Sequence, residues 1–249
     1  MVLKNKYYSI FGFNLYGGSR DSVLEWIDDG KSKSFKYIVT PNVNHVIRHD
    51  SSEIFREYYE SAGLILCDSR VLNFFFSKLF KIDIDEVIPG SDLTQAIFDK
   101  VLVAGDTIAV VGGEQETIQE LRNRLNGISI HHINPPMGYD KSPDEVRKVI
   151  DWSRSINFDY IFFATGSPRQ EKLAYLLSKE SGITGIGFCI GASILFYVGT
   201  VTRAPVWLQK MGLEWLYRIY AEPRRLLMRY VGDSFQIIPV IAKEFFRNK

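Results

Sequence analysis

The 249-residue chain is near neutral, with a formal net charge of +1, and 46% of its residues are hydrophobic. This composition excludes a disordered protein and supports one large core, so we expect one main domain with a short C-terminal appendage. The charge is unevenly spread, because residues 201–249 hold nine Lys/Arg against four Asp/Glu, a balance of +5 that leaves −4 for residues 1–200. A basic C-terminal segment indicates an anionic partner: phosphate, nucleic acid or a membrane surface.

The start of the chain and its two cysteines indicate the compartment. Residues 1–18 lack the long apolar run and the cleavage site of a secretory signal, so we expect a cytoplasmic protein. Cys67 and Cys189 lie in apolar runs, where buried reduced thiols are expected rather than a disulfide or a metal pair. Residues 182–202 carry no charge over about the length of a membrane span, but their glycines and threonines favour a strand, a turn and a short helix.

Apolar runs of strand length alternate with amphipathic stretches of helical spacing from about residue 36 to residue 200. The expected strands are 37–40, 63–67, 107–113, 128–133, 160–166 and 185–191. The expected helical stretches are 23–30, 43–62, 91–102, 114–127, 143–156 and 167–181. This alternation predicts an α/β fold with a mostly parallel sheet covered by helices on both faces.

Polar loops follow four of the expected strands, at 40–45, 67–70, 112–116 and 165–171. In open α/β sheets, ligands bind beyond the carboxyl ends of the strands. We therefore expect the polar side chains of these loops to converge on one rim of the sheet.

Asp68 is the candidate general base. It follows a strand and precedes the apolar run 71–76, which gives its carboxylate low-dielectric surroundings on one side. Partial burial raises a carboxyl pKa and makes the group a better proton acceptor near neutral pH. The alternative, on position alone, is that Asp68 caps the helix that follows.

The run from Ser167 to Gln170 also has two interpretations. It can begin a helix, with Ser167 as the N-cap, Pro168 in the first helical position and Gln170 as the capping-box partner. It can also bind an anion, since free helix amides would lie next to Arg169 and Gln170 offers a donor and an acceptor to sugar hydroxyls.

Gly112 and Gly113 permit a close approach of the backbone to a ligand, but no GxGxxG fingerprint is present, which disfavours a dehydrogenase. The pair Asp83 and Asp85 matches the Asp-x-Asp pattern with which many sugar-nucleotide transferases hold a divalent metal, yet a solvated turn explains it better. The histidines make no convincing metal set, and no serine or cysteine shows a nucleophile elbow.

The basic C-terminal segment is predicted to form two helices, 213–221 and 223–231, divided by Glu222-Pro223. Each has one apolar face, which is typical of an amphipathic appendage docked on the main domain. This helical spacing disfavours nucleic-acid binding.

Several segments, taken in order, resemble the WecG/TagA/CpsF glycosyltransferase family (glycosyltransferase family 26) over roughly residues 9–231. They are "TPNVNHV", "LILCDS", "PGSDL", "VVGG", "GSPRQEKL" and "GTVTRAPVWLQKMGLEWLYRIYAEPRRLLMRYV". The resemblance implies a Rossmann-like catalytic domain, here residues 1–200, and a basic helical appendage that binds UDP and the membrane, here residues 201–249.

The resemblance also implies an activity. It is that of an inverting transferase without a metal or other cofactor, which moves a sugar from a UDP-sugar to a polyprenyl-pyrophosphate-linked amino sugar or oligosaccharide. N-acetylmannosamine, its uronic acid and hexoses are all compatible as the donated sugar, and the product would enter cell-surface polysaccharide or teichoic acid synthesis. Such an enzyme would be a cytoplasmic protein attached peripherally to the inner face of the cell membrane. It would have no nucleic-acid partner, and it could form a homo-oligomer.

By resemblance, Asp68 corresponds to the proposed base of the family. With the loop residues above, the candidate catalytic residues are Thr40, Asn42, Asp68 and Gln170. The candidate substrate-binding residues are Gly112, Gly113, Ser167, Arg169, Arg218, Arg224 and Arg225, of which the last three would reach the UDP phosphates.

The chain departs from the family pattern at three positions. Ser69 stands where many relatives have Gly, Asn44 where an acidic residue is frequent, and Leu195 where an Asp is common. If that Asp contacts the donor sugar in relatives, donor choice differs here. The departures at Asn44 and Leu195 give slight support to an alternative, a non-catalytic nucleotide-binding or membrane-scaffold protein of the same fold.

Overall fold

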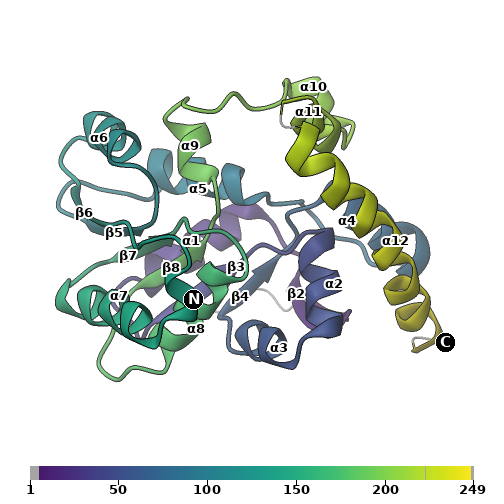
Figure 1. The fold of residues 1–249 in the computed structure, drawn as a ribbon, viewed down its shortest axis with the longest axis horizontal. Coiled ribbons are helices and arrows are strands. Elements are labelled where there is room, and N and C mark those ends of the chain that lie inside the picture. The colour runs from purple at the N-terminus through teal and green to yellow at the C-terminus, as the bar shows by residue number, and fades with distance from the viewer. Residues whose placement is uncertain (1–5, 222, 248–249) are drawn as a thin grey trace.

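The computed structural model describes residues 6–221 and 223–247, and all of their side chains except those of Val206, Lys210, Ala221 and Arg225. One eight-stranded sheet, in the order β1-β2-β4-β3-β8-β7-β5-β6, runs through the molecule with helices on both faces (Figure 1). Its strands are β1 (Tyr7–Ile10), β2 (Phe13–Tyr16), β3 (Lys36–Val39), β4 (Leu64–Leu66), β5 (Thr107–Val111), β6 (Ser129–Ile133), β7 (Tyr160–Phe163) and β8 (Ile186–Cys189). Only β1 and β2 pair antiparallel among these strands, which confirms the predicted α/β fold with a mostly parallel sheet.

The six strands predicted from the sequence are β3 to β8. The strands between the two edges of the sheet are buried along almost their whole length, because helices cover both faces. The β1–β2 hairpin was not predicted. Its turn places Phe11 and Gly12 at φ values of 53° and 77°, and tertiary contacts hold Phe11 in this conformation, since its side chain is buried and its N–H bonds to Glu244.

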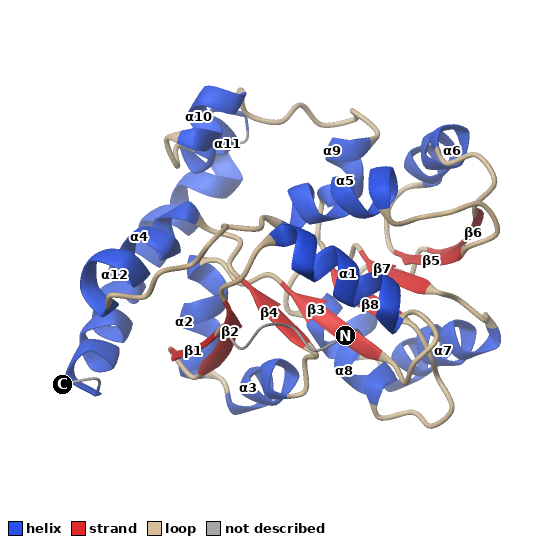
Figure 2. Ribbon diagram, turned by 180° about the vertical axis from the view of Figure 1, so that it is seen from behind, coloured by secondary structure: helices blue, strands red, loops and turns tan. Residues whose placement is uncertain are grey.

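Two layers of helices enclose the sheet (Figure 2). One layer contains α2 (Val43–Ser51), α3 (Glu53–Glu60), α4 (Arg70–Phe80), α7 (Pro143–Ser155) and α8 (Arg169–Ser178). The other contains α1 (Arg20–Gly30), α5 (Gly90–Lys100), α6 (Gln115–Arg124) and α9 (Ser193–Tyr197). A short 3-10 helix, η1 (Tyr139–Lys141), precedes α7. Both faces of the sheet therefore carry a hydrophobic core.

The stretch predicted as helical over 43–62 is two helices. Ser52 separates them, because its backbone is extended (φ −133°, ψ 115°) and its side chain accepts a hydrogen bond from the Phe55 N–H. A residue that caps one helix in this way ends the preceding one. The remaining predicted helices lie close to their expected bounds.

The C-terminal segment forms α10 (Val206–Lys210), α11 (Glu214–Ala221) and α12 (Pro223–Arg247), so the last helix is much longer than predicted. Side-chain hydrogen bonds tie α12 to the main domain, since Asn44 Nδ2 donates to Asp233 Oδ1 (2.8 Å) and Glu244 Oε1 accepts from the Phe11 N–H (3.0 Å). The domain boundary at residue 200 stays a prediction. Within the described residues, no helix has the length and apolar character needed to span a bilayer.

Candidate active site

The carboxyl ends of the parallel strands meet at one edge of the sheet, and the four polar loops predicted to form a rim follow β3, β4, β5 and β7 there. The chain also changes direction within the sheet. It leaves β5 for β6 on one side and leaves β7 for β8 on the other, although β5 and β7 are neighbours. Such a switch point opens a crevice between the two loops, where ligands bind in α/β folds.

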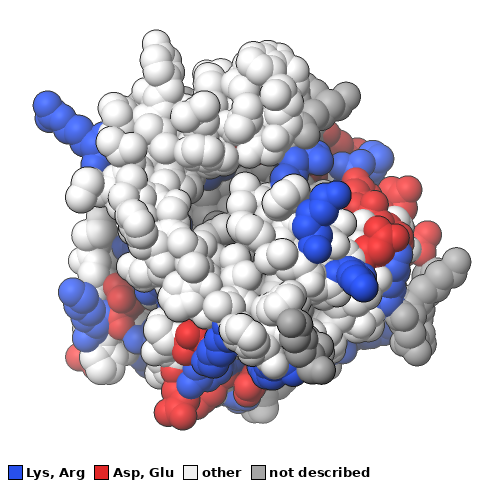
Figure 3. Space-filling view, turned by 90° about the vertical axis from the view of Figure 1, so that its right-hand side faces the viewer, with Lys and Arg blue, Asp and Glu red and all other residues white. Residues whose placement is uncertain are grey.

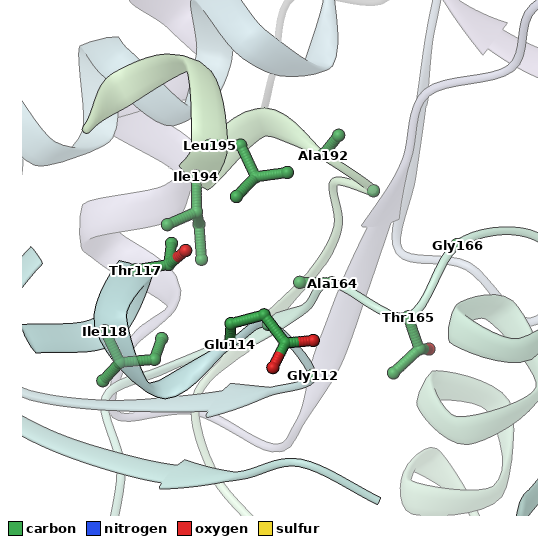
Figure 4. A pocket seen from close by; sticks show the side chains of 12 residues that line it. Gly112, Glu114, Thr117, Ile118, Ala164, Thr165, Gly166, Ala192, Ile194 and Leu195 are labelled. Atoms are coloured by element: carbon green, nitrogen blue, oxygen red, sulfur yellow. The ribbon is translucent and has the colours of Figure 1, made fainter. Parts of the chain in front are cut away.

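A pocket of about 320 Å³ lies at this switch point (Figure 4). Its walls come from the loops after β5, β7 and β8 and from the starts of α6 and α9. Ile118, Ile194 and Leu195 contribute apolar side chains to its lining, and Gly112, Gly113, Gly166 and Gly191 line it with backbone that carries no side chain. Apolar walls combined with accessible backbone groups suit a flat ring with polar edges.

Gly112 has a conformation that only glycine adopts without strain. Its φ is +92°, and a Cβ at this position would lie 2.8 Å from Thr165 Cγ2 and 3.1 Å from the carbonyl carbon of Ala164. Gly113 follows at φ +91°. Gly112 therefore allows the β5 and β7 loops to approach each other beside the pocket, which both glycines line.

Asp68 lies at the end of β4 and holds the start of a distant helix. Its Oδ1 accepts a hydrogen bond from the Gly90 N–H (2.8 Å), at the first residue of α5, where Pro89 offers no side-chain cap. Ser69 caps the helix that follows Asp68, because its Oγ accepts from the Leu72 N–H (3.3 Å). The expectation that Asp68 caps the following helix is therefore wrong.

The surroundings of Asp68 suit a general base. Burial raises the pKa of its carboxyl above the usual value, and the Gly90 N–H and the positive charge of Arg218 oppose this shift only in part. A carboxylate with a raised pKa is a stronger proton acceptor than one with the usual pKa.

Three side-chain oxygens surround the first residue of α5. A Cβ built on Gly90 would lie 3.1 Å from Thr40 Oγ1, 3.6 Å from Ser193 Oγ and 3.9 Å from Asp68 Oδ1. Ser193 directly follows Ala192, which lines the pocket. The pocket and Asp68 thus belong to one continuous rim. Ser193 was missed in the sequence, although its position just after the glycine turn of β8 was a signal.

Asn42 supports the rim as a helix cap. Its side-chain oxygen accepts from the Asn44 N–H (3.1 Å), and its own N–H donates to His45 Nδ1 (3.1 Å). The side-chain oxygen is therefore already engaged with the start of α2.

Gln170 points into the protein and is only 5% exposed. Its Oε1 accepts from the Gly191 N–H (2.9 Å), and its Nε2 donates to Glu171 Oε1 (2.9 Å). Gln170 thus holds the β8 loop, which lines the pocket, and its predicted contact with sugar hydroxyls stays a prediction.

Glu171 and His45 extend this buried network. His45 Nε2 lies 3.6 Å from Glu171 Oε1, and Glu171 is 1% exposed. Burial works to raise the pKa of Glu171, but the neighbouring His45 and the hydrogen bond from the Gln170 amide outweigh it and leave this pKa below the usual value. Glu171 therefore stays ionised and fixes the orientation of the Gln170 amide. The sequence contains no local signal for these contacts.

The predicted cap of α8 is wrong. The helix begins at Arg169 with Pro168 in the N-cap position, so Ser167 lies one residue too early to cap it. The Ser167 hydroxyl is buried and has no hydrogen-bond partner within the described part of the chain. Arg169 faces the loop after β6, where its Nη1 contacts Met137 Sδ at 3.7 Å.

Arg218 is the appendage arginine whose charge acts on Asp68. Its Nη2 donates to Glu214 Oε1 (3.3 Å), its guanidinium lies 5.3 Å from the centre of the Phe196 ring, and its charge lowers the pKa of Asp68. Arg224 is exposed in the first turn of α12. The side chain of Arg225 lies outside the described residues.

The Asp-x-Asp pair lies in an exposed turn, as expected. The Asp83 carbonyl accepts from the Tyr8 hydroxyl (2.6 Å), and Asp85 forms an ion pair with Lys6. Among the residues described, no cluster of three or more His, Cys, Asp or Glu side chains is arranged to hold a metal ion. The departure at Asn44 has a structural reason, because an acid there would face the buried carboxylate of Asp233.

A comparison with protein families agrees with the resemblance noted in the sequence. The model described as "Glycosyl transferase WecG/TagA/CpsF family" matches residues 8–249. The match covers the sheet, the rim and the C-terminal helices, and it supports glycosyl transfer in cell-surface polysaccharide synthesis. The chain therefore belongs to the WecG/TagA/CpsF family of glycosyltransferases.

Proposed function

We propose that this protein is an inverting glycosyltransferase that moves a sugar from a UDP-sugar to a polyprenyl-pyrophosphate-linked amino sugar or oligosaccharide. The observation that carries the proposal is Asp68, a carboxylate with a raised pKa on the rim that contains a glycine-lined pocket. A hydroxyl of the acceptor attacks the anomeric carbon from the face opposite UDP, and Asp68 takes its proton as the bond forms. General-base assistance of this kind contributes about 10²- to 10⁴-fold to the rate.

The donor would lie along the rim between the pocket and Asp68. The apolar wall and open glycine backbone of the pocket suit the uracil ring. Negative charge that builds on the leaving diphosphate needs cations, and Arg218 is the predicted arginine whose charge acts on Asp68 in this structure. Arg224 and Arg225, in the first turn of α12, are proposed as further cations for the diphosphate. Fixed guanidinium groups stabilise such charge well where water is excluded.

A metal-independent reaction is part of the proposal, with arginines in place of a metal ion at the diphosphate. Full activity in excess EDTA is the expected result, and strict dependence on Mg²⁺ or Mn²⁺ would contradict the arginine account.

Peripheral attachment to an anionic membrane is part of the proposal. The side on which α4 and α12 lie has a broad surface without charged side chains, hollowed at its centre and bordered by charged groups (Figure 3). Large apolar side chains of the C-terminal segment are strongly exposed, namely Trp207, Met211, Tyr220, Met228, Phe235 and Ile238. Exposed aromatic residues next to arginines are typical of helices that lie at a membrane interface.

Vesicle binding tests the membrane part. Tyr220→Ser and Phe235→Ser are expected to weaken binding to vesicles with anionic lipids, while Ile54→Ser, which alters a similarly exposed residue of α3, is the matched control. Equal binding by all three variants would contradict this part of the proposal.

The alternative, a non-catalytic nucleotide-binding or membrane-scaffold protein, predicts UDP-sugar binding without turnover. A transfer assay with a radiolabelled donor sugar distinguishes the two. Label that moves to the lipid fraction supports the enzyme, and its absence with a full panel of donors would favour the scaffold.

A further inference from the structure

A row of charged side chains connects the start of α5 to α11. Arg203 Nη1 donates a hydrogen bond to Asp92 Oδ1, and its Nε lies 3.8 Å from Glu214 Oε1. Arg218 Nη2 donates to the same Glu214 oxygen at 3.3 Å. Glu214 therefore lies between two arginines, one held by the main domain and one whose charge acts on Asp68.

Arg203 is held by Asp92, but its Nε lacks a hydrogen-bond acceptor among the described residues. Its side chain is 20% exposed, and its Nε is buried without a hydrogen-bond partner within the described part of the chain. At 3.8 Å, the Glu214 oxygen is too far for a hydrogen bond to this nitrogen. An unpaired buried donor is costly, so a small approach of Glu214 toward Arg203 is favourable once Arg218 no longer holds that oxygen.

Two anionic groups compete for Arg218. In this structure it pairs with Glu214, but a diphosphate at the rim is the stronger partner because it carries more charge and several acceptor oxygens. To bind the diphosphate, Arg218 must leave Glu214. The Glu214 carboxylate, which is only 25% exposed, would then lose a cationic partner, and this is unfavourable.

We infer that Arg203 is a positioning residue that receives Glu214 when Arg218 moves to the diphosphate of the donor. The inference rests on the proposed function, since it assigns the partner of Arg218. Asp92 anchors Arg203 in the first turn of α5, the same turn whose Gly90 N–H holds Asp68. Occupation of the diphosphate position is thereby coupled to the element that orients the base.

Calorimetric titration with UDP tests this role in the full-length protein. Arg203→Met is expected to weaken UDP binding about three- to tenfold, because Glu214 then has Arg218 as its main cation and retains it. Glu214→Gln is expected to tighten binding by about two- to fivefold, because Arg218 is released.

The double variant Arg203→Met/Glu214→Gln decides between exchange and simple structural support. It should bind UDP as Glu214→Gln does, since no carboxylate remains for Arg203 to receive. A double variant as weak as Arg203→Met would overturn the inference, and so would weaker binding by Glu214→Gln alone. The measurement on Glu214→Gln tests the inference even if Arg203→Met does not fold.

The matched control is Arg147→Met on α7, which removes another arginine held by two acids, Asp151 (2.6 Å) and Glu180 (2.8 Å). Its UDP affinity should equal that of the wild type. Wild-type protein that does not bind UDP would contradict the proposed function, whereas wild-type binding with no change in Arg203→Met would overturn only the role of Arg203.

Discussion

The substitution Asp68→Asn separates the chemical role of Asp68 from its structural one. The amide oxygen of Asn can still accept from the Gly90 N–H, which Asp68 Oδ1 accepts at 2.8 Å, so the start of α5 is kept. Burial already disfavours the carboxylate and raises its pKa, so loss of the charge costs little stability. We expect the unfolding free energy to stay within about 1 kcal/mol of the wild type, and turnover to fall about 10²- to 10⁴-fold.

Asp68→Ala is the companion variant. It loses the base and also leaves the Gly90 N–H without an acceptor at a helix start, where Pro89 provides no side-chain cap. The free energy of unfolding should fall by about 1–3 kcal/mol, while turnover falls as in Asp68→Asn.

The assay combines initial rates of transfer at saturating UDP-sugar, urea unfolding and UDP titration. UDP affinity of Asp68→Asn should stay near that of the wild type. The wild-type rate should also decrease as the pH falls through the raised pKa of Asp68, above the usual 3.8, because protonation removes the base. Asp68→Asn with more than a tenth of wild-type turnover would refute the assignment.

Three further predictions concern stability and reactivity. Gly112→Ala should lower the free energy of unfolding by about 1–3 kcal/mol in urea and weaken UDP binding, because φ is +92° and the new Cβ would meet Thr165. Burial lowers the pKa of His49 to about 4, so the unfolded chain binds this proton more tightly and the wild type should lose up to about 3 kcal/mol of stability as the pH falls from 6.5 to 4. His49→Phe should lack that loss in urea unfolding measured across this pH range. Cys67 and Cys189, whose thiol pKa values burial raises, should not react with a thiol reagent such as DTNB until the protein unfolds, and rapid reaction in buffer would contradict their burial.

The sequence predicted those strands and helices whose formation depends mainly on neighbouring residues. Apolar runs and helical periodicity located β3 to β8 and most helices, and buried reduced cysteines were also confirmed. The β1–β2 hairpin was missed because its strands are short, and contacts with α12 far along the chain help to hold its turn. The break at Ser52 was missed because the apolar spacing continues across it.

For the candidate site, the sequence predicted which loops form it but not which partners their side chains contact. Asp68 was recognisable from its place after a strand, but its partner, the Gly90 N–H, lies 22 residues away in sequence. The direction of Gln170 depends on Gly191, and the caps of α8 depend on where the preceding loop enters the helix. The contacts of Arg218 with Glu214 and Phe196 depend on how α11 docks. Such contacts follow from tertiary packing, which overrides local preference.

We propose that this rim is where a sugar is transferred from UDP to a lipid-linked acceptor. The most direct test of this proposal is a panel of UDP-sugars incubated with the protein and a short-chain polyprenyl-pyrophosphate-linked N-acetylglucosamine, with the products read by mass spectrometry. With at least one donor and in the presence of EDTA, the wild-type protein should give an acceptor that is heavier by one sugar. Asp68→Asn should not give this product. Binding of UDP-sugars without product from any donor would contradict the proposal.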